Sequence, residues 1–151
     1  MLVSSQLELG SNVEINIIDV KSSKIIQTIK KKNLVVTSGI NLARDLLDGT
    51  TTIAVNYLGV GTGTTAVAAG DTTLESEQFR GAITKRTSVS GAFTMAYYLS
   101  STQGNGNDLT EAGLFDTSSG GSMFSRVTYS AITKTSSIAV MYSWTINMSA
   151  S

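Results

Sequence analysis

The chain has 151 residues, enough for one domain with its own hydrophobic core. Eleven basic and eleven acidic side chains give a formal net charge of zero, which argues against a nucleic-acid-binding or membrane-surface protein that works through bulk positive charge. Cys and His are absent, which excludes a disulfide framework, a thiolate zinc site and the commonest general base, and no apolar stretch approaches the roughly 20 residues of a membrane-spanning helix.

The first predicted element is a β-hairpin near the N-terminus. Residues 13–20 and 24–30 are rich in strand-forming side chains, and three turn-forming residues separate them. Apolar residues alternate in the first run, which predicts one buried face. We expect residues 13–20 to form an exposed edge strand that contacts neighbouring subunits through main-chain pairing. Lys30–Lys32 follow the hairpin and indicate a solvated edge rather than a binding patch.

The clearest helical pattern lies in residues 33–50, where apolar side chains recur at helical spacing. Thr37 or Ser38 is expected to cap the start of this helix, and Gly49 stands where a C-terminal cap belongs.

A short strand over residues 56–60 is predicted to run into a Gly- and Thr-rich loop. Gly59, Gly61 and Gly63 are expected to permit a tight loop with positive φ after the strand. Residues 61–66 superficially match a dinucleotide fingerprint, but no helix opens directly behind the glycines, as phosphate binding requires. We interpret this segment as a flexible loop, and we expect residues 61–70, which are loosely tied to the core pattern, to contact other subunits.

A second, short helix is predicted over residues 73–80, because residues 72 and 75 have the spacing of a capping box. Asp71 would then place a negative charge at the positive end of the helix dipole. Glu77 and Arg80 would form an exposed pair three residues apart on that helix.

The second half of the chain is predicted to be strand throughout. Residues 91–100 and 136–149 alternate apolar and polar side chains, as half-buried antiparallel strands do, and residues 117–121 are predicted to be a hairpin turn. Trp144 is expected in the core. Tyr97 and Tyr98 lie on opposite faces of their strand, so one of them is expected to point outward, and an outward Tyr98 would suit a subunit contact.

These elements predict a mainly β fold, namely an antiparallel β-sandwich or barrel-like domain with one or two short helices. We expect a single domain over residues 1–151, with an N-terminal hairpin in residues 1–31 and a core in residues 32–148. Glu111 and Arg126 fall on the two arms of the predicted hairpin and are expected to face one another.

Few residues suggest chemistry. The loop 104–111 gathers oxygen-bearing side chains that calcium favours, but its spacing does not match an EF-hand and its Asn-Gly step is typical of a turn. The carboxylate pairs Glu75/Glu77 and Asp45/Asp48 give no convincing catalytic arrangement. We therefore expect no enzyme activity, no cofactor and no metal, and we treat Arg80, Glu111 and Arg126 as scaffold residues.

Two stretches resemble structural proteins of tailed bacteriophages. Residues 57–80 (YLGVGTGTTAVAAGDTTLESEQFR) are similar to a strand ending in "GVGTGTT" followed by "DTxLxxExxR", and residues 109–135 (LTEAGLFDTSSGGSMFSRVTYSAITKT) are similar to an "EAGLFD" and "MFAR" hairpin of the same proteins. Residues 32–47 also resemble their "kNlv" segment. The order and spacing agree over about residues 32–148.

The resemblance implies a structural part of a virion, assembled in the cytoplasm of the host bacterium. We expect a homo-oligomer in the tail, neck or collar-fibre region that contacts other virion proteins and neither nucleic acid nor membrane. One alternative is a head decoration protein bound to the major capsid protein on the outer shell. Another is a host glycan-binding module, suggested by the Tyr, Trp and Asn content; an enzyme is the weakest hypothesis.

Overall fold

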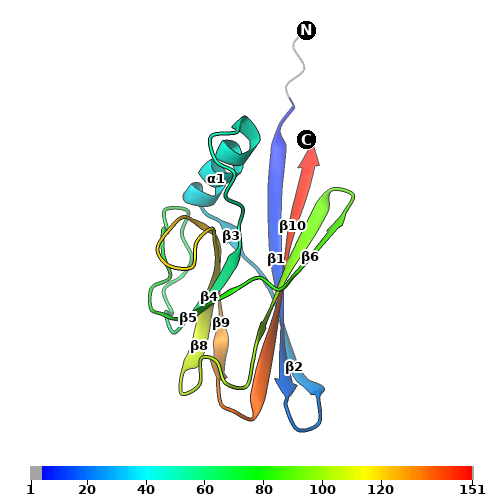
Figure 1. The fold of residues 1–151 in the computed structure, drawn as a ribbon, viewed down its shortest axis with the longest axis vertical. Helices are drawn as coiled ribbons and strands as arrows, with labels where there is room; N and C mark the ends of the chain where they lie inside the picture. The colour runs from blue at the N-terminus through cyan, green and yellow to red at the C-terminus, as the bar shows by residue number, and fades with distance from the viewer. Residues whose placement is uncertain (1–4, 151) are drawn as a thin grey trace.

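The computed structural model describes residues 5–150 and consists of two antiparallel β-sheets packed face to face, with one helix beside them (Figure 1). The first sheet has the strand order β2-β1-β10-β7-β6, and the second has the order β3-β9-β8-β4-β5. The elements are β1 (Leu7–Asp19), β2 (Lys24–Lys32), β3 (Leu34–Val35), α1 (Thr37–Asp48), β4 (Tyr57–Gly61), β5 (Glu77–Ala82), β6 (Lys85–Val89), β7 (Ala92–Leu99), β8 (Asp108–Phe115), β9 (Met123–Thr133) and β10 (Ile138–Ala150).

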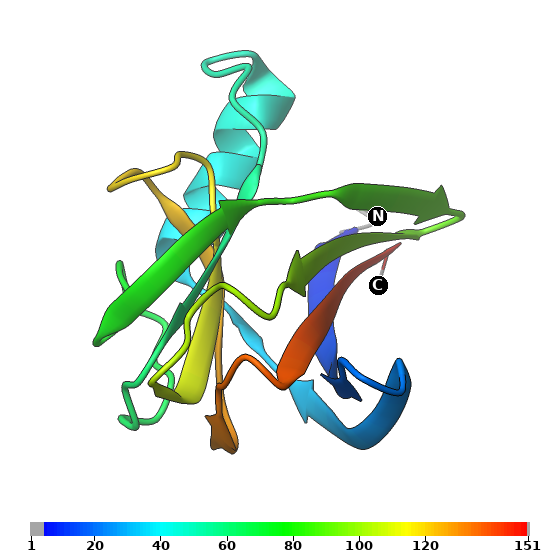
Figure 2. The same cartoon turned by 60° about the horizontal axis from the view of Figure 1, so that its bottom comes forward.

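The predicted mainly β, sandwich-like fold is confirmed. Over the described residues the two sheets do not close into a barrel, and the view in Figure 2 shows them as two separate layers. Antiparallel sheets of this kind bury one face each against the other, which explains the alternating sequence pattern. Among residues 5–150 no helix has the length and apolar character needed to cross a membrane.

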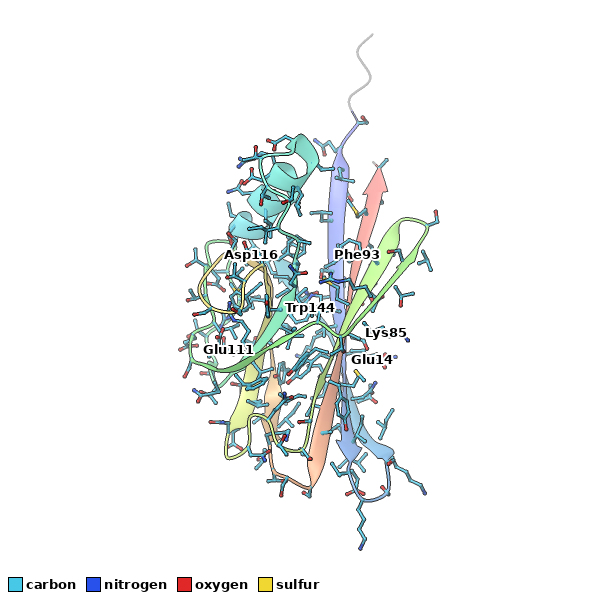
Figure 3. The ribbon with its side chains drawn as sticks, in the orientation of Figure 1. Glu14, Lys85, Phe93, Glu111, Asp116 and Trp144 are labelled. Carbon is cyan, nitrogen blue, oxygen red and sulfur yellow. The ribbon has the colours of Figure 1, made fainter. Side chains whose placement is uncertain are left out.

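The core between the sheets is built on β10. Its alternating side chains are buried, and Trp144 and Tyr142 have no exposed surface. Trp144 pairs with Val13 of β1 on one side and with Met95 of β7 on the other, so three strands place large side chains in the same layer. Figure 3 shows Trp144 between the two sheets. The expectation that Trp144 lies in the core is confirmed.

The N-terminal hairpin is present, as β1 and β2, but the prediction that residues 13–20 form an edge strand is wrong. β1 lies between β2 and β10 and pairs with β10 along its whole length, from Leu7 opposite Ala150 to Asp19 opposite Ile138. The edge is β2 instead. Since β1 contributes buried side chains to the main core, the hairpin and residues 32–148 share one core.

Helix α1 begins and ends close to the predicted positions. Gly49 adopts φ 80°, the left-handed conformation of a C-terminal cap, as predicted. The predicted N-terminal cap is wrong, because Val36 holds that position and makes no side-chain cap. Ser38 Oγ donates to the carbonyl of Met123 at 2.6 Å and so ties the helix to β9.

The helix predicted over residues 73–80 is absent from the structure. The chain there forms a loop that continues from residue 62 to residue 76, and β5 begins at Glu77. The capping-box signal was misleading because the backbone N–H groups of Glu75 and Ser76 bind a carboxylate from β8 instead of starting a helix. Residues from Glu77 onward also pair with β4 as strand β5, which a helix could not do.

Candidate functional site

Glu111 and Arg126 face one another, as predicted, and the structure shows that they form a buried ion pair. Ala112 and Leu114 of β8 belong to the main core, so Glu111 faces the opposite side of the second sheet, away from the first sheet (Figure 3). Arg126 projects from the neighbouring strand β9, and its Nη2 and Nε lie 2.9 and 3.0 Å from Glu111 Oε2. Both side chains are at most 3% exposed, which makes this a desolvated, charge-assisted contact.

The Glu111 carboxylate also fastens the loop of residues 62–76, called here the 62–76 loop. Its Oε1 accepts hydrogen bonds from the backbone N–H of Gly63 at 3.0 Å and of Ser76 at 2.8 Å, and its Oε2 accepts one from Glu75 at 3.1 Å. One buried side chain therefore holds both ends of the loop. These donors satisfy an anion that would otherwise be costly to bury.

Arg126 holds the middle of the same loop. Its Nη1 lies 2.8 Å from Asp71 Oδ2, its Nη2 donates to the carbonyl of Thr65 at 3.1 Å, and Glu75 Oε2 is 3.9 Å from Nη2. We call Asp71, Glu75, Glu111 and Arg126 the Arg126 network. The premise that this loop is loosely tied to the core is therefore wrong, although its role in subunit contacts stays a prediction.

Electrostatics favours the charged forms of Asp71, Glu75 and Arg126. Burial opposes ionisation of Asp71, but the N–H of Ala68 and the guanidinium of Arg126 outweigh it and lower the pKa of this carboxyl. Hydrogen bonds from Thr65 lower the pKa of Glu75. Burial also disfavours the Arg126 cation, yet Asp71 and Glu111 raise its pKa overall. The network is thus a set of mutually stabilised charges.

Asp71 does not lie at a helix N-terminus, because no helix follows it. Its carboxylate closes a turn by accepting the N–H of Ala68 at 3.0 Å and faces Arg126 on its other side. Asp71 therefore pairs with Arg126, which is 55 positions away in the chain, and not with a helix dipole.

Gly61 and Gly63 have a different role from the one predicted, since neither adopts positive φ. A Cβ atom on Gly61 would lie 2.5 Å from Glu111 Oε1, and one on Gly63 would lie 2.6 Å from the same oxygen. Real Cβ atoms do not approach other atoms so closely. These glycines are required because the Glu111 carboxylate and the returning end of the loop, at Glu75 and Ser76, lie directly against their backbone.

Arg80 is a strand residue that anchors the turn after β8. It pairs with Glu77 at 2.6 Å, as predicted, but on β5 and with its own side chain only 8% exposed. A bulge in β5 puts both residues on one face, since Gly59 pairs with Arg80 and Gly61 pairs with Glu77. Arg80 also lies 3.5 Å from the centre of the Phe115 ring, where a cation is attracted to the aromatic face.

The predicted turn at residues 117–121 is confirmed between β8 and β9. Gly120 and Gly121 have φ of 60° and 70°, which few other residues adopt. Arg80 Nη1 donates to the carbonyls of Thr117 and Gly120, each at 2.9 Å. The turn is therefore held by the same face of the second sheet that holds the 62–76 loop.

Tyr98 lies apart from these contacts, on β7 of the first sheet. It is 42% exposed and its neighbour Tyr97 is 3% exposed, which confirms that one points outward and the other inward. Tyr97 donates to Gln103 Oε1 at 3.0 Å, and burial raises the pKa of its hydroxyl.

The loop 104–111 contacts the ammonium group of a lysine, Lys134. Lys134 is buried, and its Nζ donates to Asn105 Oδ1 at 2.7 Å and to the carbonyl of Thr135 at 3.1 Å. Burial lowers the pKa of this ammonium. Asp108 instead accepts a hydrogen bond from Thr133, and Glu111 belongs to the Arg126 network, so the oxygen-bearing side chains of this loop do not converge.

Neither the burial of Lys134 nor a buried pair of tyrosines is predicted from the sequence. The hydroxyls of Tyr129 and Tyr142 lie 2.8 Å apart, and Tyr129 donates to the carbonyl of Glu111. Burial raises the pKa of both hydroxyls. A lone Lys among Thr residues and two tyrosines on separate strands carry no pattern that predicts such contacts.

The geometry is that of a structural network rather than a reactive centre. The charged groups around Arg126 are engaged with one another and with backbone groups that hold a loop. Among residues 5–150, no group of three or more acidic side chains is placed to hold a metal ion. Comparison of the chain with protein-family models, with curated proteins and with solved structures finds no match.

Proposed function

We propose that this chain is a non-enzymatic structural component of a tailed-bacteriophage virion. It assembles by subunit contacts in the tail, neck or collar-fibre region, as a homo-oligomer that also binds other virion proteins. The starting point is the resemblance of residues 57–80 and 109–135 to phage structural proteins. What the geometry adds is an account of what those two stretches do.

The observation that carries the proposal is that the two resembling stretches interlock. Gly61, Gly63 and Asp71 come from the first stretch, and Glu111 and Arg126 come from the second. All five meet in or against the Arg126 network. Residues that depend on one another in this way are expected to occur together, in order and at a fixed spacing. We therefore interpret the two motifs as marks of a scaffold that this chain shares with the phage proteins it resembles. Their charged residues then serve folding.

The glycan-binding alternative gains less support. Sugar-binding platforms need the face of an aromatic ring to be open to the ligand. Trp144 and Tyr142 are fully buried, and Tyr129 is 6% exposed. Among the described tyrosines and tryptophan, Tyr98 is the one that is more than a third exposed. A single exposed tyrosine suits a subunit contact as well as it suits a sugar.

Labelling of intact particles tests the proposal. Gold-conjugated antibody against the purified chain would be applied to virions of the phage that encodes it and imaged by electron microscopy. We expect label at the neck or tail, with particles lacking the gene as the control. Label over the icosahedral shell would make the chain a head decoration protein. Particles without label would overturn both assignments.

A further inference from the structure

An apolar cavity of about 260 Å³ opens at one end of the sandwich, between α1 and the ends of β1, β7 and β10. Figure 1 shows these elements diverging at that end, and Phe93, labelled in Figure 3, lines the cavity from β7. Arg86 is also in the wall, but its guanidinium is already bound to the carbonyl of Val55 and to Asn56 Oδ1. The cavity is therefore an opening into the hydrophobic core.

Large apolar side chains stand exposed around this opening. Leu47 of α1 is 76% exposed, Leu7 of β1 is 57% exposed, and Leu46 and Met148 are each 37% exposed. Together they leave on the order of 400 Å² open to water, within the range of the largest apolar patch on a typical monomer, which is often functional. A stable interface buries about 800 Å² on each partner, of which about 60% is apolar. The patch supplies most of that apolar part.

The open end offers both a projecting side chain and a hollow. Leu47 projects beside a hollow large enough to receive it, since an apolar cavity of about 150 Å³ already admits a benzene molecule. In a two-fold dimer both copies contribute the same patch. The projecting side chain of each copy can then enter the hollow of the other. A chain of zero net charge also has no overall repulsion to overcome.

The strand edges of the first sheet are less suited to self-association. β2 carries Lys24 and Lys30–Lys32, and β6 carries Lys85. Pairing any two of these edges would bring like charges together, which is a recognised protection against edge-to-edge contact. Among the described residues, the wall of the open end contains one charged side chain, Arg86, and its guanidinium is already bound within the chain.

We propose that two copies of this chain associate through the open end, with Leu47 of each copy entering the cavity of the other. The choice of a second copy, rather than a foreign protein, rests in part on the proposed function. The contact would close the core of both copies and remove the exposed leucines from water.

Sedimentation velocity of the full chain, from micromolar to hundreds of micromolar, tests this contact. We expect a monomer–dimer equilibrium, and we expect Leu47→Asp to raise the dissociation constant at least tenfold because a charge would enter an apolar cavity. Ile26→Asp is the matched control, since Ile26 is 61% exposed but lies on β2, outside the cavity. It should leave the dissociation constant within about twofold. Circular dichroism would show that both variants fold.

A second measurement does not depend on breaking the contact. Because the chain has no cysteine, Leu47→Cys offers a single thiol for a polarity-sensitive fluorophore. Its emission should shift to the blue as concentration rises, whereas the same label at Ile26→Cys should not respond. A monomer at every concentration, or equal effects at both positions, would overturn the proposal. Neither result depends on where gold label falls on virions, so failure of the dimer and failure of the virion role are distinguishable.

Discussion

The outer face of the second sheet carries charged side chains that are buried, whereas the open end of the sandwich carries apolar side chains that are exposed. On the outer face, the 62–76 loop covers Glu111 and Arg126, and each charge finds a partner within the chain. At the open end, Leu47 and Leu7 meet no such cover. The chain thus covers the charges of one surface by itself and leaves large apolar side chains of the other in water.

The comparison also separates two kinds of stabilisation. The Arg126 network adds specificity to the fold, because it holds one loop in one path by directional contacts. The open end offers non-directional apolar surface, which gains free energy only when water is removed. Each of the following predictions tests one side of this contrast.

The largest expected effect is at Arg126. Arg126→Met should lower the free energy of unfolding by about 3–5 kcal/mol, because it leaves the Glu111 carboxylate buried without its cation. Urea denaturation measures this loss. The double variant Arg126→Met/Glu111→Gln should recover part of the stability. Arg44→Ala, which removes a pair with a 64% exposed arginine, should change it by less than about 1 kcal/mol. Equal losses at the two arginines would contradict the assignment of Arg126 as the structural centre.

The next effect is at the backbone beneath the carboxylate. Gly63→Ala should cost about 1–3 kcal/mol, because its Cβ would press on Glu111 Oε1. Gly70→Ala lies in the same loop with nothing within 4 Å of its Cβ, and it should be neutral or gain up to about 1 kcal/mol through the unfolded chain. Thermal denaturation of the two variants gives the comparison. If both alanines behaved alike, close packing against the carboxylate would not be the reason for Gly63.

Much of the first sheet was predictable, because its strands alternate apolar and polar residues and a period of two is visible in the sequence. Apolar side chains at helical spacing predicted α1, and Gly49 predicted its end, where a left-handed residue is needed. Sequence pattern failed for residues 73–80, since their backbone donors bind Glu111, a residue far along the chain that no local pattern reveals. Sequence pattern also failed to predict the edge strand of the first sheet. The order of strands depends on which strands pair with β10, and an alternating pattern does not show this.

The candidate residues were found more reliably than their roles. Glu111 and Arg126 were paired correctly because both lie on the arms of one predictable hairpin. Asp71 and the two glycines were singled out for local reasons, a helix start and a tight turn, and both reasons were wrong. Their contacts are with the carboxylate of Glu111 or the guanidinium of Arg126. Such contacts become visible only when the 62–76 loop is placed over β8 and β9.

Acid should weaken the network at its loop side. The folded-state pKa of Asp71 is lowered, so its contribution is complete above its unfolded value of about 3.9 and is lost as pH falls below it. Asp71→Asn should therefore cost about 1 kcal/mol near neutral pH and progressively less below about pH 4. Urea midpoints from about pH 6 to about pH 3 measure this convergence. In the Arg126→Met background, Asp71→Asn should cost much less, and an undiminished cost would contradict their coupling.

The smallest effect on folding is expected at Leu47, where the contrast between the two surfaces is sharpest. Leu47→Ala should change the stability of the monomer by about 0.5 kcal/mol or less, because its side chain is already in water. Leu42, on the same helix, is 6% exposed, and Leu42→Ala should cost about 2–5 kcal/mol. Denaturation at submicromolar concentration keeps association out of both values. A large loss at Leu47 would mean that this leucine already serves the fold of a single copy. A negligible loss, together with weakened self-association, would mean that it serves contact between copies.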